Sequence, residues 1–311
     1  MHVLVTGSSG LIGTALVETL VAGDHRVTRL VRPGSGLGRT PAGAPVTDVA
    51  WDPHRGTIDS AGLQAAGPFD GAVNLAGAGV GDKRWSAARK QVVLASRTDS
   101  TTLVATALAA LNPSPPVLVS GSAVGYYGDR GDEIVTEESP AGTGFLAGVC
   151  VAWERAAAPA RSADIRTVLL RTGIVLSAAG GALAKQLPLF RMGVGGRTGS
   201  GRQYRSWITL DDHIAAVLHC LADSTIAGPV NATAPNPSTD AGLAHALGAV
   251  LHRPSFLAVP SPVLKLALGT GMATEMILTG QRVLPEKLVA SGFSFAHPEL
   301  DGALRAVLVG S

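Results

Sequence analysis

A glycine-rich turn near the start of the chain constrains the fold more than any other feature of the sequence. The run Thr6-Gly7-Ser8-Ser9-Gly10-Leu11-Ile12-Gly13 follows a short apolar segment and precedes a segment whose apolar residues recur at helical spacing. In a strand–turn–helix unit, Gly7 permits the tight turn, Gly10 lets a pyrophosphate approach the backbone, and Gly13 allows close packing of helix on strand.

The start of such a helix also offers unpaired N–H groups to an anion. The turn therefore predicts a dinucleotide site, and the alternative is a glycine-rich turn without a ligand. The residues expected to bind the cofactor here are Gly7, Gly10, Leu11, Ile12 and Gly13.

Short apolar runs alternate with helical patterns through the first half of the chain. The runs are Val3–Val5, Val27–Val31, Ala72–Leu75, Val117–Ser120 and Thr167–Leu170. Alternation of this kind is typical of the α/β class, so we predict a doubly wound parallel Rossmann sheet. Beyond Asn236 the pattern becomes helical with proline interruptions, which predicts a smaller, mainly helical C-terminal lobe.

The domain boundaries follow from these patterns. Residues 1–175 are expected to form the NADP-binding Rossmann domain, to which 206–235 returns through a short strand, Gly228–Ala232. Residues 176–205 and 236–311 are expected to form the smaller, substrate-side lobe. The Gly- and Pro-rich segment 33–45 is predicted to be a surface excursion.

Charge and cysteine content limit the partners of the chain. The net charge is +2 and no block of consecutive Lys or Arg occurs, so we expect neither nucleic acid nor a membrane as a partner. Cys150 and Cys220 lie in apolar stretches without metal-ligand spacing, which indicates buried thiols in a reducing compartment and a cytoplasmic location. The eight histidines show no ligand spacing either, so no metal is expected.

The residue that ends the second predicted strand indicates which cofactor is bound. An NAD enzyme would place an acid there, on the ribose 2′-OH, whereas this chain has Arg32. A guanidinium suits a 2′-phosphate through charge-assisted bonds, so the pattern favours NADP(H). The alternative is a solvated surface arginine.

The spacing G-x-x-G-x-x-G resembles the extended short-chain dehydrogenase/reductase superfamily, and so does the turn Asn74-Leu75-Ala76-Gly77. That resemblance places Leu75, Ala76 and Gly77 beside the adenosine half of the cofactor. The alternative is a strand that simply ends at Gly77.

A serine-bearing segment, 120–128, follows the next strand and also resembles that superfamily. Ser122 would face the substrate, and Tyr126 or Tyr127 would supply the proton if hydride transfer occurs; the alternative is a serine-rich strand end that caps a turn. The superfamily's Tyr-x-x-x-Lys pair is missing, because those two positions hold Leu146 and Cys150. Its usual acid–base mechanism therefore does not transfer to this chain.

Several runs together resemble an atypical branch, the NAD(P)-dependent epimerase family proteins related to short-chain dehydrogenase family member 39U1. The runs are Asn74–Gly77, Arg84-Trp85, Ser96-Arg97, Val124–Gly128, Trp153-Glu154, Arg171–Gly173, Gly199–Gln203, Ser206–Ile208, Pro235–Pro237 and Gly280–Pro285. The resemblance implies that Arg97 faces the cofactor and that Ile174 lies by the nicotinamide pocket. It implies no particular substrate.

The segment 202–208 resembles the part of extended members that grips a nucleotide-sugar phosphate. Arg202 and Arg205 are the predicted substrate-binding residues, and the alternative is a flexible loop with solvated arginines. We expect an NADP(H)-dependent oxidoreductase or epimerase-like enzyme acting on a small polar molecule. The other hypothesis is an NADPH-binding sensor or scaffold without turnover. A second copy of the chain, as a homodimer, is a further expected partner.

Overall fold

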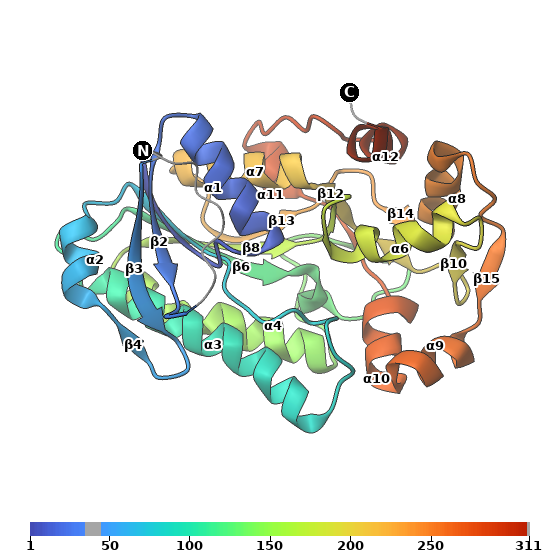
Figure 1. Ribbon diagram of the computed structural model, residues 1–311, viewed down its shortest axis with the longest axis horizontal. Coiled ribbons are helices and arrows are strands. Elements are labelled where there is room, and N and C mark those ends of the chain that lie inside the picture. Colours follow the sequence, from blue (N-terminus) through green and yellow to red (C-terminus); the bar gives the residue numbers. More distant parts are fainter. Residues whose placement is uncertain (35–44, 310–311) are drawn as a thin grey trace.

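An eight-stranded sheet lies at the centre of the molecule (Figure 1). The computed structural model describes residues 1–34 and 45–309. Across the sheet the strands are β13 (Gly228–Ala232), β8 (Arg166–Thr172), β6 (Val117–Ala123), β5 (Gly71–Asn74), β1 (His2–Thr6), β2 (Arg26–Val31), β3 (Val46–Asp52) and β4 (Thr57–Ile58). All neighbours pair in parallel except β3 and β4, which are antiparallel. The predicted doubly wound parallel sheet is confirmed.

The order of the strands creates a crevice at one edge of the sheet. From β1 the chain runs outward to β2 and β3 on one side, then returns to β5, β6, β8 and β13 on the other. Ligands of doubly wound sheets bind at this kind of reversal, outside the carboxyl ends of the strands. The glycine turn directly follows β1, so it lies at that point.

Helices cover both faces of the sheet (Figure 1). One face carries α1 (Leu11–Ala22), α7 (Leu210–Ala222) and α11 (Glu286–Ala290). The other carries α2 (Ser60–Ala66), α3 (Ala87–Ala109), α4 (Phe145–Ala156) and α5 (Ala158–Ser162). Successive strand side chains point to opposite faces, so Val3 and Val5 join the core under α1 while Leu4 joins the core under α3. Burial on both faces explains why the strands are continuous apolar runs.

The smaller lobe has its own apolar core, which includes Leu187, Phe190, Trp207, Leu247 and Leu304. Its helices are α6 (Gly181–Arg191), α8 (Asp240–Leu251), α9 (Ser261–Leu268), α10 (Thr270–Ala273), a π-helical turn (Thr274–Leu278) and α12 (Leu300–Val309).

Four short strand pairs accompany these elements. They are β10 (Gly196–Thr198) with β15 (Leu257–Val259), β11 (Tyr204–Arg205) with β14 (Ser238–Thr239), β12 (Trp207–Thr209) with β9 (Ile174–Leu176), and β16 (Arg282–Val283) with β7 (Ile134–Val135). Between β6 and β7, residues Val124–Tyr127 form a 3₁₀ turn.

The segment 206–235 divides between the two parts of the molecule. Strand β13 joins the main sheet beside β8, and α7 packs on the α1 face. Strand β12 instead pairs with β9, and Trp207 belongs to the core of the smaller lobe. Of the predicted surface excursion at 33–45, residues 35–44 lie outside the described residues.

Candidate functional site

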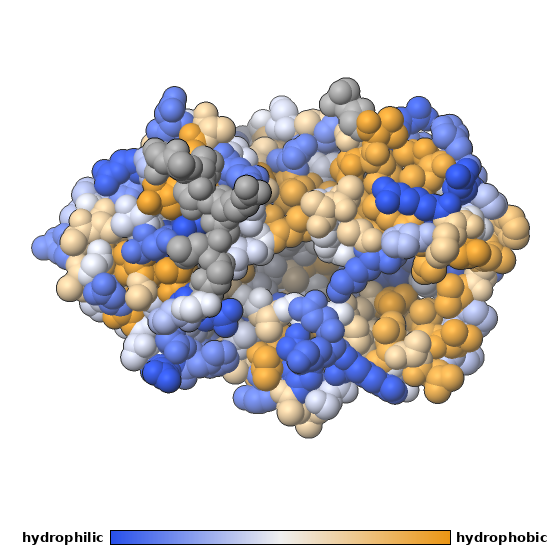
Figure 2. Space-filling view, viewed as in Figure 1, coloured by the Kyte–Doolittle hydropathy of each residue, from blue (hydrophilic) through white to orange (hydrophobic). Residues whose placement is uncertain are grey.

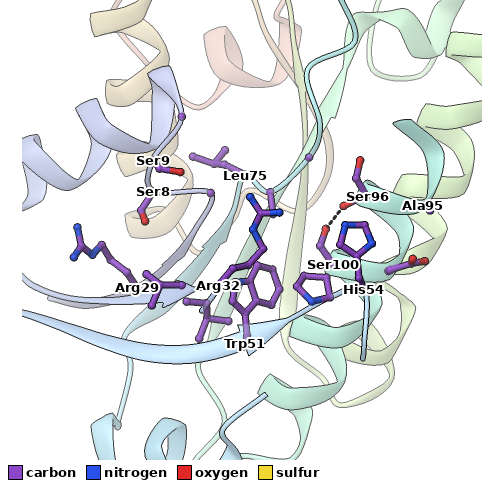
Figure 3. Close-up of a pocket in the computed structure, with 18 residues that line it drawn as sticks. Ser8, Ser9, Arg29, Arg32, Trp51, His54, Leu75, Ala95, Ser96 and Ser100 are labelled. Atoms are coloured by element: carbon purple, nitrogen blue, oxygen red, sulfur yellow. Dashed lines mark hydrogen bonds between the residues drawn. The ribbon is translucent and has the colours of Figure 1, made fainter. Parts of the chain in front are cut away.

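A pocket with a cavity volume of about 240 Å³ opens at the carboxyl ends of β1 and β2 (Figure 3). Its walls come from the glycine turn (7–10), the end of β2 with Arg32 (29–32), the end of β3 with the residues after it (51–54), the segment after β5 (75–77) and one face of α3 (95–100). Among the predicted cofactor residues, those that line it are Gly7, Gly10, Arg32, Leu75, Ala76 and Gly77. Those outside its lining are Leu11, Ile12, Gly13, Arg97 and Ile174.

The three glycines of the turn have different surroundings. Gly7 has a φ of +68°, and a Cβ there would lie 2.6 Å from the carbonyl carbon of Leu75. A Cβ on Gly13 would overlap the carbonyl oxygen of Gly7. A Cβ on Gly10 would meet only the Gly7 oxygen, at 3.4 Å. Gly7 and Gly13 thus let the turn close, whereas Gly10 leaves space open beside the pocket.

The N-terminus of α1 differs from those of the helices that have a polar cap. The side chains of Asp59, Ser86, Thr209 and Thr239 accept hydrogen bonds from backbone N–H groups at the starts of α2, α3, α7 and α8. The N-cap of α1 is Gly10, which supplies no side-chain acceptor. The first N–H groups of α1 are therefore left for an anion.

A buried hydrogen-bond chain fixes the segment after β5 against the turn. The Thr6 hydroxyl donates to Asn74 Oδ1 (2.6 Å), and Asn74 Nδ2 donates to the Thr101 hydroxyl on α3 (2.8 Å). The backbone N–H of Leu75 in turn donates to Thr6 Oγ1 (3.2 Å). This chain sets the backbone of 75–77 next to Gly7, where it forms one wall of the pocket.

Polar and aromatic side chains form the opposite wall. Figure 3 shows Arg32 and His54 directed between the turn residues Ser8 and Ser9 and the α3 residues Ser96 and Ser100. Trp51, the last buried residue of β3, lines the same space.

Sequence reasoning missed Trp51, His54 and Asp99 as lining residues. Trp51 lies at the carboxyl end of β3 and His54 follows just after it. Because the carboxyl ends of parallel strands share one edge of the sheet, this position along the strand is the signal that could have found them. Asp99 lines the pocket only because α3 packs beside it, and no local pattern in the sequence specifies that packing.

Arg97 supports the pocket from behind. Its guanidinium donates to the carbonyl of Ala78 (2.9 Å) and to that of Val93 (3.0 Å), and it lies 4.9 Å from the centre of the Trp153 ring. Burial lowers the pKa of this side chain from its ordinary value. Arg97 thus holds the backbone just beyond Gly77.

The predicted catalytic residues cluster around Arg171 at the ends of β6 and β8. Arg171 forms a bidentate pair with Glu154 of α4 (2.8 and 3.0 Å), and the Ser122 hydroxyl donates to the same carboxylate (2.7 Å). The Tyr127 hydroxyl donates to Asn231 Oδ1 (2.6 Å) and accepts from Arg171 (3.0 Å).

This cluster is closed to solvent at two of the three predicted residues. Ser122 is 3% exposed and Tyr127 is 0% exposed, and burial raises the pKa of Tyr127 to about 12. Tyr126 is half-buried, and the guanidinium carbon of Arg171 lies 3.5 Å from the centre of its ring. Tyr126 also borders a separate hollow beside Glu154. The structure brings the three residues together around Arg171, and their catalytic roles stay predictions.

The positions of the missing Tyr-x-x-x-Lys pair lie beside the 3₁₀ turn. The backbone N–H of Leu146 donates to the Glu275 carboxylate from the smaller lobe (2.8 Å). Cys150 is buried, and this burial raises the pKa of its thiol to about 12. At neutral pH the side chain at this position is therefore a neutral thiol, which lacks the charge of a lysine.

The two arginines predicted to bind substrate differ in their surroundings. Arg205 is 7% exposed, pairs with Asp240 (2.8 Å) and donates to the carbonyls of Ile277 and Thr279. Its guanidinium is thus bonded to groups of the smaller lobe, and its predicted contact with a substrate phosphate stays a prediction. Arg202 is exposed.

Comparisons with known proteins agree with this architecture. Residues 3–231 match the model of the NAD dependent epimerase/dehydratase family, and residues 259–307 match a domain of unknown function, DUF1731. The "Epimerase family protein Mb2239" of Mycobacterium bovis is 43% identical over 302 residues, covering 97% of this chain and 96% of that protein. The chain belongs to the NAD dependent epimerase/dehydratase family.

A second set of relatives defines the branch of this epimerase family. The human "Epimerase family protein SDR39U1" is 37% identical, covering 99% of this chain and 100% of the human protein. The crystal structure of human SDR39U1 (isoform 2) with NADPH superposes with a TM-score of 0.85 at 33% identity and full coverage of both chains. The resemblance to member 39U1 inferred from the sequence motifs is confirmed.

A further solved structure is similar over a part of its own length. The nucleoside-diphosphate sugar epimerase of Corynebacterium glutamicum has a TM-score of 0.76 and 34% identity, covering 99% of this chain and 58% of that one. Within residues 1–34 and 45–309, no helix is long and apolar enough to span a bilayer, and no cluster of His, Cys, Asp and Glu is arranged to hold a metal ion.

Proposed function

We propose that this epimerase family protein binds NADP(H) in the pocket beside the glycine turn. The observation that carries the proposal is the pairing of an uncapped helix N-terminus at Gly10 with Arg32 in the same pocket. The first fits a pyrophosphate and the second fits a 2′-phosphate. The NADPH complex of the human relative supports the same choice of cofactor.

Each wall of the pocket has a defined part in this proposal. The open space at Gly10 admits the pyrophosphate, and the backbone of Leu75, Ala76 and Gly77 faces the adenosine half. Arg32, at the end of β2, receives the 2′-phosphate. Leu11 and Ile12 contribute backbone N–H groups, and Ile174, at the start of β9, borders the nicotinamide end. NADP(H) supplies or accepts a hydride when it is bound.

We further propose an NADP(H)-dependent oxidoreductase or epimerase-like activity on a small polar substrate. The substrate would lie under the smaller lobe, where exposed Arg202 is available to an anionic group. The Glu154–Arg171 pair with Ser122 and Tyr127 holds the ends of β6 and β8 in place, and therefore positions the floor on which the nicotinamide would rest.

A second candidate function is a sensor or scaffold that binds NADPH without turnover. The observation that favours it is the pair Leu146 and Cys150, which supplies neither a phenol nor a cation at the superfamily's acid–base positions. In both versions the expected partner is a small molecule, not nucleic acid. The location is the cytoplasm, in agreement with two buried free cysteines.

One experiment separates the two candidates. Purified protein is incubated with NADPH and a panel of aldehydes, ketones, quinones and nucleotide sugars, and the absorbance of the reduced nicotinamide is followed. Oxidation that disappears in the Gly10→Asp variant supports the enzyme. NADPH binding without oxidation of the cofactor by any member of the panel supports the sensor. Absence of NADPH binding in the wild-type protein would contradict both.

A further inference from the structure

The smaller lobe carries most of the exposed apolar side chains of the molecule. Of the twelve large apolar residues that are exposed in the described part of the chain, seven lie between residues 189 and 266. They are Leu189 (49% exposed), Met192 (66%), Val194 (47%), Phe256 (80%), Leu257 (42%), Val263 (54%) and Leu266 (80%). The other five are scattered from Met1 to Val309.

These residues belong to elements that are joined to one another. Arg253 Nε donates to the carbonyl of Arg191 at the end of α6 (3.0 Å), and Phe256 bridges to Gly196 at the start of β10. Strand β15 pairs with β10 and leads directly into α9, in which every residue is at least partly exposed. Figure 2 shows hydrophobic side chains gathered over α9, at the lower right. We call the seven residues and the cations among them the apolar–basic face.

The two segments that carry this face contain no acidic residues. Neither residues 176–210 nor residues 241–274 contain an aspartate or a glutamate. The same segments expose four cations of this face: Arg191, Arg197, Arg253 and Lys265. The net charge of +2 averages over the whole chain and therefore conceals this segregation.

We propose that the apolar–basic face docks on an anionic lipid surface. Exposed apolar side chains interleaved with Lys and Arg, and without acids, suit the boundary between acyl chains and anionic headgroups. A two-fold contact with a second copy would set the same cations against each other, so the charge argues against a homodimer through this face. The inference departs from the expectation drawn from net charge, and it does not depend on the proposed activity.

Vesicle co-sedimentation of the full chain tests the proposal. The wild-type protein is expected to sediment with vesicles of phosphatidylcholine mixed with phosphatidylglycerol, and not with vesicles of phosphatidylcholine alone. Added salt is expected to weaken the binding. Replacing two cations, as Arg191→Glu with Lys265→Glu, should lower the partition coefficient by at least about 30-fold. Phe256→Ser with Leu266→Ser should also abolish sedimentation, which distinguishes docking from attraction by charge alone.

A matched control variant lies away from this face. Val289→Ser with Arg26→Glu changes one exposed apolar residue and one exposed cation on α11 and β2, and its vesicle binding should equal that of the wild type. All variants should keep the wild-type affinity for NADPH, which shows that they are folded and tests the cofactor proposal separately.

Three outcomes would overturn the proposal. One is a wild-type protein that binds neither kind of vesicle. Another is a control variant that loses as much binding as the others. The third is a dimer in sedimentation velocity that Phe256→Ser with Leu266→Ser disperses while vesicle binding is absent, because that result assigns the face to a second copy.

Discussion

Two places along the same edge of the sheet have opposite surroundings. At the carboxyl end of β1, the helix that follows has no side-chain cap, and a cavity opens beside it. At the carboxyl ends of β6 and β8, the Glu154–Arg171 pair occupies the interior, and the Ser122 and Tyr127 hydroxyls bond to fixed neighbours. The first place keeps donors for a ligand, and the second uses its polar groups within the protein.

The difference shows that a sequence motif predicts function more directly at the glycine turn than at the ends of β6 and β8. The glycine turn acts through its backbone, so any chain that folds this way presents the same N–H groups. A side-chain hydroxyl acts through its surroundings, and the hydroxyls of Ser122 and Tyr127 are buried.

The largest effect is expected on stability, when the buried Glu154–Arg171 network is broken. Arg171→Met leaves the Glu154 carboxylate buried without its cation, which should reduce the free energy of unfolding by about 3–5 kcal/mol. Urea denaturation measures it. Arg155→Met, at an exposed arginine on the same helix as Glu154, is the control and should change stability by less than about 0.5 kcal/mol. A variant at Arg171 as stable as the wild type would show that the network is unimportant to the fold.

The next largest effect is expected on NADPH affinity, at the pocket beside the glycine turn. Gly10→Asp puts a carboxylate into the space left for the pyrophosphate, so NADPH affinity should fall at least about a hundredfold, or ~2.7 kcal/mol. The circular-dichroism spectrum should stay native, because a Cβ at Gly10 meets only one atom. Gly148→Asp adds the same charge to open space on α4, and calorimetry should find its NADPH binding unchanged. Equal binding by the Gly10 variant would place the pyrophosphate elsewhere.

Arg32→Ala sharpens the comparison because it removes a cationic side chain that lines the pocket beside the glycine turn. The charge-assisted contact to a 2′-phosphate contributes about 1.5–3 kcal/mol, so NADPH should bind more weakly by that amount. NADH lacks this phosphate, and its affinity in the same variant should stay close to that of the wild type. Fluorescence titration of both cofactors measures this. Equal affinities of the wild type for NADPH and NADH would argue against the assignment of Arg32.

The smallest effect is expected at Cys150. Its thiol is buried and protonated, so Cys150→Ala should leave NADPH affinity within about threefold. A small cavity should lower the melting temperature slightly. Both quantities come from titration and thermal unfolding of the same preparation. A large loss of activity on an identified substrate, with affinity and melting temperature unchanged, would instead identify a catalytic thiol.

Much of the fold could be predicted from the sequence because its signals are local. The runs at Val3–Val5 and Val117–Ser120 are apolar because each strand is buried on both faces, and they lie in the sheet as expected. Gly7 and Gly13 are required by contacts within the turn itself. The place of β12 outside the main sheet was not predictable in this way, since its partner β9 lies more than thirty residues earlier.

The sequence by itself determined the strand–turn–helix unit, the missing acid–base pair at Leu146 and Cys150, and the guanidinium at Arg32. Only the tertiary structure decided that Arg205 bonds within its own lobe and that Tyr127 is enclosed. It also brought His54 into the pocket beside the glycine turn. The physical reason is that backbone geometry follows from neighbouring residues, whereas the exposure and partners of a side chain depend on elements that are distant in sequence and meet only when the sheet and the smaller lobe pack.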